Sequence, residues 1–185
     1  MDNARRLHPL SLGLHWLVAL CVIGLIGVGI FMVRTEAWSL YHWHKSIGLL
    51  AFTLILARVI WRLRNGMPAP LGEASPLVHL AARAAHWALL LLTVLLPVSG
   101  MLFSGASGHG FGVFSLSLFP HQYDPAKPGE AIPFNAPLAE AAQLGHQILG
   151  YTLAALIALH VLAALKHHLL DRDGTLRRML GQQVS

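Results

Sequence analysis

Two histidines, His146 and His160, stand fourteen residues apart in a long apolar segment near the C-terminus. In an α-helix, fourteen residues rise about 21 Å and rotate by a net angle of roughly −40°, so both imidazoles would lie on nearly the same face. Ionisable side chains inside a membrane are costly and usually have a function. The spacing therefore predicts a helix that offers one ligand to a metal centre near each surface of a membrane.

The composition favours a membrane protein. Hydrophobic residues make up 55% of the 185 residues and charged residues only 11%, whereas a soluble domain has about 25% charged residues. The formal net charge is +5, but the basic residues lie at the ends of apolar segments, so this charge does not indicate a nucleic-acid partner. The single cysteine, Cys21, excludes an intrachain disulfide and the Cys-X-X-Cys-His motif of covalently attached haem.

Four apolar segments are long enough to cross a bilayer, which takes about 20 helical residues. We expect one all-α transmembrane domain over residues 1–185, with spans at about 10–33, 42–64, 77–103 and 138–169. The first segment is longer than the apolar region of a signal peptide and no cleavage site follows it, so we interpret it as a retained span. The long connection 104–137 predicts a functional loop or a short surface helix.

Lysine and arginine are concentrated on one side of this predicted bundle. On that side lie Arg5, Arg6, Arg58, Arg62, Arg64, Arg83, Lys166, Arg172, Arg177 and Arg178. The opposite connections contain only Arg34, Lys45 and Lys127. Because basic residues stay on the cytoplasmic side of a membrane, we expect both termini in the cytoplasm and the protein in a bacterial inner membrane.

Depth in the membrane pairs four of the histidines. His15 enters the first span from the cytoplasmic side, where His160 approaches the end of the fourth span. His44 and His146 open the second and fourth spans from the outer side. Haem iron accepts an axial ligand on each face of the ring, and helical bundles hold cofactors between facing helices. The sequence predicts a four-helix bundle around two haems, with His15 and His160 at the inner one.

Other histidines compete with this set. His42 competes with His44, but Gly48, four residues after His44, leaves space for a flat ring on the same face. Gly150 has the same offset from His146, although small residues also promote close helix packing without a cofactor. We interpret a further set as polar residues at the water boundary, namely His8, His79, His109 and His121. His86 could contact haem, quinone or water.

Four more residues are candidates for secondary roles. Arg58 and Arg62 lie four apart and could bind haem propionates through charge-assisted hydrogen bonds, or they could act only as cytoplasmic anchors. Lys45 is the corresponding outer candidate, with a snorkelling lysine as the alternative. His167 follows the face of His160 and could hydrogen-bond a quinone carbonyl and pass a proton. The alternative for His167 is a surface position near anionic lipid.

Motifs along almost the whole chain resemble the bacterial cytochrome b561 proteins, which are related to the cytochrome b subunits of nickel–iron hydrogenases. The matching motifs are Leu14–Ala19, His44–Gly48, Arg58–Arg62, Ala85–Trp87, Leu96–Gly100, Gly145–His146, His160–His168 and Asp173–Met179. The resemblance implies two non-covalent haem b groups. Their axial ligands would be His15, His44, His146 and His160. Free-standing members resemble quinone-linked electron carriers, and some are similar to superoxide:ubiquinone oxidoreductases.

We predict an oxidoreductase or electron carrier that links an outer-side one-electron donor, such as superoxide, to the ubiquinone pool. Its partners would be membrane lipid, ubiquinone and the donor, without nucleic acid. Outer-side groups would steer an anionic donor by charge; these are Lys45, Lys127, His109 and His121. One alternative is a membrane anchor that relays electrons for a separate dehydrogenase or hydrogenase. Another is a metal-ion transporter, which the near absence of carboxylates in the spans disfavours.

Overall fold

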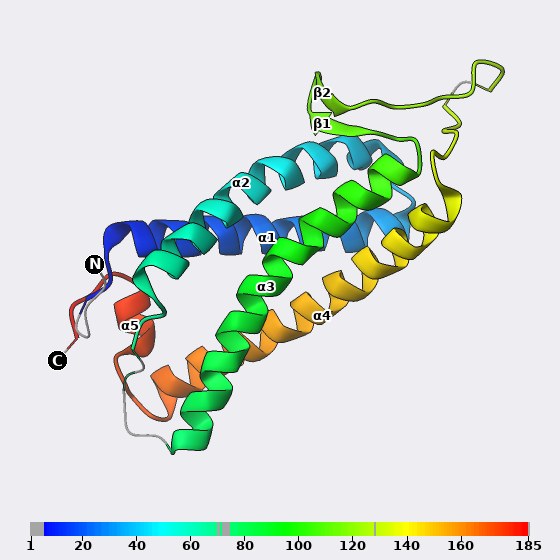
Figure 1. Cartoon of the computed structure of the whole chain (residues 1–185). Helices are drawn as coiled ribbons and strands as arrows, with labels where there is room; N and C mark the ends of the chain where they lie inside the picture. Colours follow the sequence, from blue (N-terminus) through cyan, green and yellow to red (C-terminus); the bar gives the residue numbers. More distant parts are fainter. Residues whose placement is uncertain (1–5, 70, 72–74, 128, 185) are drawn as a thin grey trace.

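The computed structural model describes residues 6–69, 71, 75–127 and 129–184 (Figure 1). Its four long helices are α1 Pro9–Thr35, α2 Tyr41–Asn65, α3 Pro76–Ala106 and α4 Ala136–Leu169. The shorter elements are η1 Trp38–Leu40, α5 Thr175–Met179, β1 Phe111–Val113 and β2 Leu116–Phe119. Four helical segments in this part of the chain are long and apolar enough to span a membrane, which confirms the predicted fold class. Arg5, one of the basic residues counted above, lies outside the described residues.

Local capping starts three of the four long helices. The side chains of His8, Ser75 and Asn135 each accept a hydrogen bond from a backbone N–H of the first turn, and a proline follows within two residues. Such caps satisfy backbone donors that have no partner within the helix, and proline has no donor to lose there. The helices extend the expected spans by a few residues, most of all at the end of α3.

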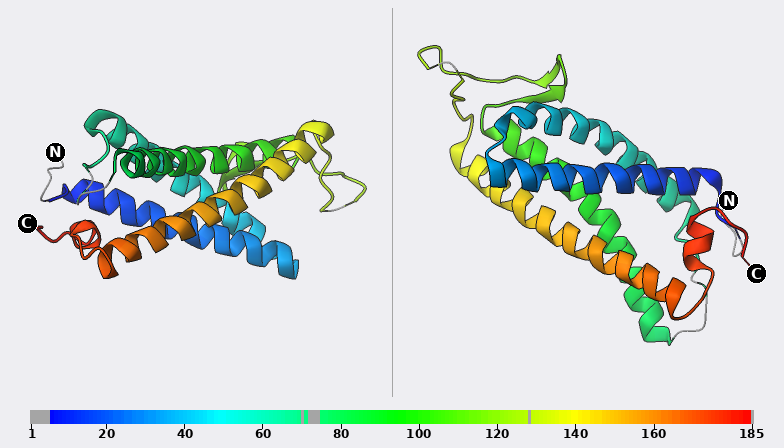
Figure 2. Two further views of the ribbon diagram at one scale, coloured as in Figure 1. Left: turned by 90° about the horizontal axis from the view of Figure 1, so that it is seen from below. Right: turned by 180° about the vertical axis from the view of Figure 1, so that it is seen from behind.

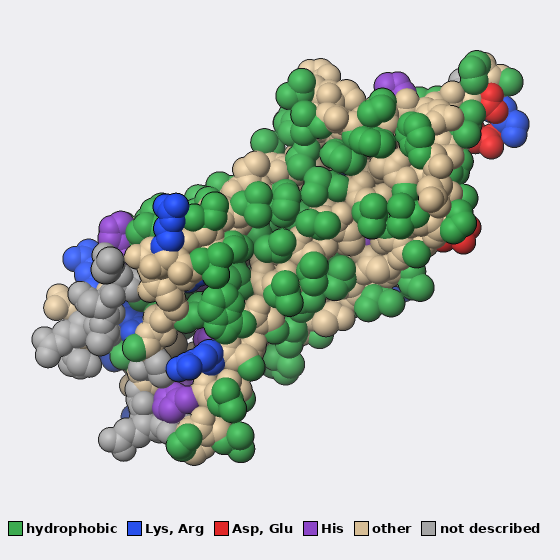
Figure 3. Space-filling model, in the orientation of Figure 1, with side chains coloured by type: hydrophobic (Ala, Val, Ile, Leu, Met, Phe, Trp, Pro, Cys, Tyr) green, Lys and Arg blue, Asp and Glu red, His purple; other side chains and the backbone are tan. Residues whose placement is uncertain are grey.

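The long helices form an elongated bundle in which α1 lies against α2 and α3 against α4 (Figures 1 and 2). A small apolar core holds them together, formed by Val18, Val22, Ile55 and Leu153. Hydrophobic side chains also cover the outside of the bundle, whereas charged side chains gather toward its two ends (Figure 3). An apolar surface between charged ends is what a protein surrounded by lipid requires.

A β-hairpin closes one end of the bundle. Strands β1 and β2 pair antiparallel within the connection between α3 and α4, so this connection is a hairpin and not the surface helix considered above. The Ser46 hydroxyl accepts a hydrogen bond from the Phe114 N–H at 2.9 Å. Ser104 donates to the Gly110 carbonyl at 2.6 Å, and Gly110 has a positive φ of 58° that suits glycine. The hairpin is thereby fixed to α2 and α3.

The C-terminal segment closes the opposite end, where α5 lies near the start of α1 (Figure 2). The Trp16 indole N–H donates to the Met179 carbonyl at 2.8 Å. The Arg178 guanidinium donates to the Ala69 carbonyl, also at 2.8 Å. These bonds hold α5 against α1 and against the segment that follows α2. Each end of the bundle therefore has its own cover, the β1–β2 hairpin at one end and α5 at the other.

Candidate functional site

The structure brings four histidines of the long helices together as two pairs. At the end with α5, the ring centroids of His15 on α1 and His160 on α4 are 6.5 Å apart. At the end with the hairpin, the centroids of His44 on α2 and His146 on α4 are 6.4 Å apart. We call these the inner pair and the outer pair. All four side chains are half-buried.

These separations can be compared with what one metal ion between two imidazoles requires. An imidazole nitrogen binds a first-row metal ion at about 2.0–2.1 Å. A five-membered ring with bonds of about 1.35 Å has its centre about 1.15 Å from each atom. Two imidazoles on opposite sides of one ion therefore have centroids about 6.4 Å apart. The two observed separations, 6.5 and 6.4 Å, fit a haem iron in each pair.

Two glycines that the sequence did not single out as site residues make room for the outer pair. A Cβ added at Gly100 would lie 3.0 Å from Cε1 of His146, and one at Gly29 would lie 3.3 Å from Cε1 of His44. Gly48, expected to leave space, has no heavy atom within 4 Å of such a Cβ. The small residues of the first span and the Pro-Val-Ser-Gly motif of the third were the available signals, but neither showed which glycine faces a ring.

The outer rings otherwise contact uncharged groups. Nδ1 of His146 lies 3.0 Å from the carbonyl oxygen of Leu96 and 3.0 Å from the Ser99 hydroxyl. Nδ1 of His44 is buried and has no hydrogen-bond partner among the described residues. An open apolar groove of about 410 Å³ lies beside His44 between α1 and α2, and His146 does not line it. The buried ring nitrogen without a partner, and not this groove, is the feature that suits a site built to hold another group.

The inner pair, in contrast, lies beside a cation. Nη2 of Arg58 is 3.1 Å from Nδ1 of His15. Arg62, one helical turn further, is buried, and its guanidinium donates to the Gly66 carbonyl at 3.3 Å. The ring of His86 lies 5.3 Å from that of His160, which is shorter than the separation of two ligands on opposite sides of one ion. His86 therefore lies beside the inner pair, but its ring is too close to His160 for the two to bind one metal ion from opposite sides.

His42 and Lys45 both face the hairpin. The exposed His42 ring lies 6.2 Å from the ring of Phe114, so His44 is the histidine of this segment that meets His146. The Lys45 ammonium donates to the carbonyls of His109 and Gly110 at 3.3 and 3.0 Å. Backbone oxygens just before the hairpin thus bind the Lys45 ammonium group.

The other outer polar residues belong to the cover or its edge. Burial lowers the pKa of His109 below its usual value, and the Lys45 charge lowers it further. His121 lies against Tyr123 with ring centroids 4.9 Å apart. Lys127 forms an exposed ion pair with Glu130 at 3.1 Å. The Tyr123 ring also lies 6.5 Å from that of His109, so Lys45, His109 and His121 lie near one another, whereas Lys127 pairs with Glu130.

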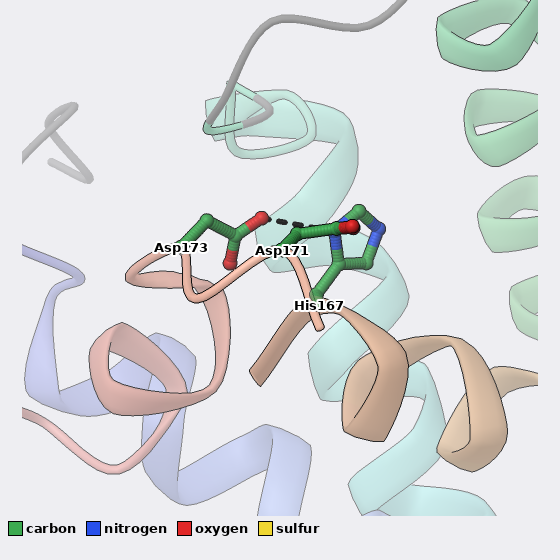
Figure 4. Close-up of side chains that lie close together, drawn as sticks. All are labelled: His167, Asp171 and Asp173. Carbon is green, nitrogen blue, oxygen red and sulfur yellow. Dashed lines mark ion pairs between the residues drawn. The ribbon is translucent and has the colours of Figure 1, made fainter. Parts of the chain in front are cut away.

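His167 lies at the inner end with two carboxylates (Figure 4). Its Nδ1 is 3.0 Å from Asp171 Oδ2 and 2.9 Å from Asp173 Oδ2. Partial removal from water raises the pKa of Asp173, but hydrogen bonds from Thr175 and the neighbouring His167 outweigh it, and the net pKa lies below its usual value. The three side chains could together hold a metal ion, although Lys166 already pairs with Asp171 at 2.7 Å.

A bundle of four apolar helices that carries two pairs of facing histidines has the construction of a membrane cytochrome of the b type. The sequence profile described as prokaryotic cytochrome b561 matches residues 6–182. The chain is 38% identical over 191 residues to "Cytochrome b561 homolog 2" of Escherichia coli (strain K12), covering 100% of this chain and 96% of the relative. It is 32% identical over 174 residues to "Probable superoxide oxidase CybB" of Yersinia pestis, covering 92% and 93%.

This chain belongs to the prokaryotic cytochrome b561 family. The predicted resemblance is therefore confirmed, together with the location in a bacterial inner membrane that the four apolar helices and the family support. Membership implies b-type haem and a role in transmembrane electron transfer. The number of haems, their ligands and the substrates are finer points, which the next subsection takes up.

Proposed function

We propose that this protein binds two haem b groups, one in each histidine pair, and transfers electrons from an outer-side donor to ubiquinone. The observation that carries the proposal is the separation of the paired rings, 6.5 and 6.4 Å, which matches the distance of about 6.4 Å expected for two imidazoles on one metal ion. The ligands would be His15 and His160 at the inner site and His44 and His146 at the outer site.

Superoxide is the donor we propose, because one relative is named a probable superoxide oxidase. Two superoxide ions would each lose one electron and become O₂. One ubiquinone would take both electrons and two protons. When bound, two haems would supply one-electron chemistry at both depths of the membrane.

The chain's own residues would bind and orient the reactants. Arg58 and Arg62 would offer guanidinium donors to haem propionates at the inner site. Lys45 would contribute positive charge near the outer surface, where it also binds the hairpin. His167, held by Asp171 and Asp173, would hydrogen-bond a quinone carbonyl and pass protons from the cytoplasm.

The orientation is part of the proposal. Nine of the twelve lysines and arginines among the described residues belong to the segments at the inner end, and the other three, Arg34, Lys45 and Lys127, to the segments at the outer end. Because positive charge remains on the cytoplasmic side, we place both termini there and the hairpin on the periplasmic side.

The proposal is tested by purifying the protein in detergent and measuring haem with reduced spectra and the pyridine haemochrome method. We expect two b haems per chain, and one in each of the variants His15→Ala and His44→Ala. His42→Ala is the matched control and should keep two, because its ring faces the hairpin. A colourless protein that takes up no haem would contradict the proposal and favour a metal-ion transport path.

The donor and acceptor are tested on the same preparation. The isolated protein should reduce ubiquinone when superoxide is generated in the solution. Copurification with a stoichiometric redox partner, and no quinone reduction without it, would instead favour the relay-subunit alternative.

A further inference from the structure

The second ring nitrogen of one outer histidine faces an acceptor. Nδ1 of His146 lies 3.0 Å from the Leu96 carbonyl oxygen. A carbonyl oxygen only accepts, so Nδ1 carries the proton and the lone pair of Nε2 is available to a metal ion. A hydrogen bond of this kind raises the basicity of a metal-binding imidazole. Ser99, 3.0 Å from the same nitrogen, adds a second polar contact.

The same nitrogen of one inner histidine faces a donor. Nδ1 of His15 lies 3.1 Å from Nη2 of Arg58, and a guanidinium has donors but no acceptor. When Nε2 of His15 binds a metal ion, the single proton of the neutral ring belongs on Nδ1, where it meets a cation instead of an acceptor. Arg58 therefore cannot raise the basicity of His15 as Leu96 raises that of His146.

The two pairs also differ in the charge around them, since more positive charge lies near the inner pair than near the outer pair. Arg62 is only 7% exposed and lies one turn from Arg58 on α2, so two guanidinium groups lie on the inner side. The contacts of the outer rings come from glycines, a carbonyl oxygen and a hydroxyl. The nearest lysine on α2, Lys45, is turned to the hairpin carbonyls. Partly buried charges are only weakly screened by salt.

We infer that Arg58 makes the inner haem site the one of higher reduction potential, so that an electron shared between the sites resides mainly at the inner one. The inference rests on the proposed two-haem function. Reduced iron carries one positive charge fewer than oxidised iron, so neighbouring cations favour it, and so does a less basic ligand. At the outer pair the more basic His146 ligand favours the oxidised state, and the polar contacts of that ring are uncharged. Arg58, which the proposed function also assigns to a haem propionate, acts here through its charge and through its contact with His15.

The test is a spectroelectrochemical titration of the purified protein, with haem content measured on each sample. The wild type should show two midpoints, and the higher one should be absent in His15→Ala and present in His44→Ala. Arg58→Gln removes the charge and offers Nδ1 of His15 an acceptor. It should lower the higher midpoint so that the equilibrium between the haems shifts about tenfold, or about 59 mV for one electron.

Two further variants separate charge from structure. Arg58→Lys keeps the positive charge and should keep the higher midpoint close to that of the wild type. Arg62→Gln should lower the same midpoint by a smaller amount, because Arg62 lies one turn further along α2, where its guanidinium donates to the Gly66 carbonyl. If Arg58→Gln does not assemble, the assignment of the midpoints carries the test, because a higher midpoint that is absent in His44→Ala would overturn the inference.

The outcomes separate this inference from the function on which it rests. Two haems with unchanged midpoints in Arg58→Gln would overturn the inference alone. A shift confined to the midpoint that His44→Ala removes would do the same. A wild-type protein with fewer than two haems would overturn the proposed function, and the inference with it.

Discussion

The inner and outer histidine pairs share one separation but differ in what surrounds them. At the outer pair, Gly29 and Gly100 let the rings approach the neighbouring helices closely, and the polar contacts come from a carbonyl and a hydroxyl. At the inner pair, a guanidinium lies against one ring. The type of ligand sets which cofactor fits, whereas the contact of the second ring nitrogen sets the basicity of that ligand toward the metal ion.

The covers of the two ends differ as well. The hairpin at the outer end is fixed by side chains of α2 and α3 that donate to or accept from its backbone, including Lys45 and Ser46. The inner end is covered by α5, held by Trp16 and Arg178. The outer cover thus comes from a connection between spans, and the inner cover comes from the chain terminus.

The largest effect expected from a single methyl group is at Gly100. The added Cβ in Gly100→Ala would lie 3.0 Å from Cε1 and 3.2 Å from Nδ1 of His146, and a shift of the ring would disturb the contact of its Nδ1 with the Leu96 carbonyl. We expect loss of the outer haem, with one haem per chain retained in the pyridine haemochrome assay. Two haems in this variant would show that the approach of α3 to His146 does not define the outer site.

A smaller effect is expected at Gly29. The Cβ in Gly29→Ala would lie 3.3 Å from Cε1 of His44, so a shift of a few tenths of an ångström would relieve it. We expect partial occupancy of the outer haem and a lower thermal stability of haem binding. The matched control is Gly27→Ala on the same helix, where nothing lies within 4 Å of the new Cβ. Equal haem content in the two variants would contradict the prediction.

Ser99→Ala refines the comparison of the second contacts. The variant removes the hydroxyl 3.0 Å from Nδ1 of His146 but keeps the Leu96 carbonyl, so the imidazole becomes slightly less basic. We expect the midpoint potential of the outer haem to rise by about 28 mV, which corresponds to a threefold change in its equilibrium constant for one-electron reduction. The inner midpoint should not move. A fall of the outer midpoint would show that Ser99 acts as a donor to the ring.

The smallest effect concerns the pH dependence of the outer cover. Burial and the Lys45 charge lower the pKa of His109, so the folded hairpin favours neutral His109. Its stability should therefore fall as the pH drops below about 6.5, the usual pKa of histidine. Faster amide hydrogen exchange of residues 109–119 at pH 5.5 than at pH 7.5, after correction for the intrinsic rate, is the expected result.

The control for this effect is His109→Gln, which should remove the difference between the two pH values. Lys45→Gln should reduce the difference, because the second cause of the lowered pKa is then absent. A pH dependence that persists unchanged in His109→Gln would assign it to another group of the cover.

Several features of this protein follow from its sequence alone. Hydropathy over windows of about 20 residues predicts the four spans, and helical periodicity predicts that His146 and His160 share a face. Their depth predicts which histidines of α1 and α2 they approach. These inferences depend only on local geometry and on the thickness of the membrane, and the helix bounds and ring distances agree with them. The roles of Lys45 and His167 stay predictions.

Only the tertiary structure decided what touches the rings. The sequence contains 17 glycines, and only the crossing of helices shows that Gly29 and Gly100 face His44 and His146. The contact of Arg58 with His15 depends in the same way on the rotation of α2 against α1. The hairpin depends on backbone hydrogen bonds to side chains more than sixty residues away in the sequence. Such contacts arise from helix packing, for which one-dimensional periodicity carries no information on the partner face.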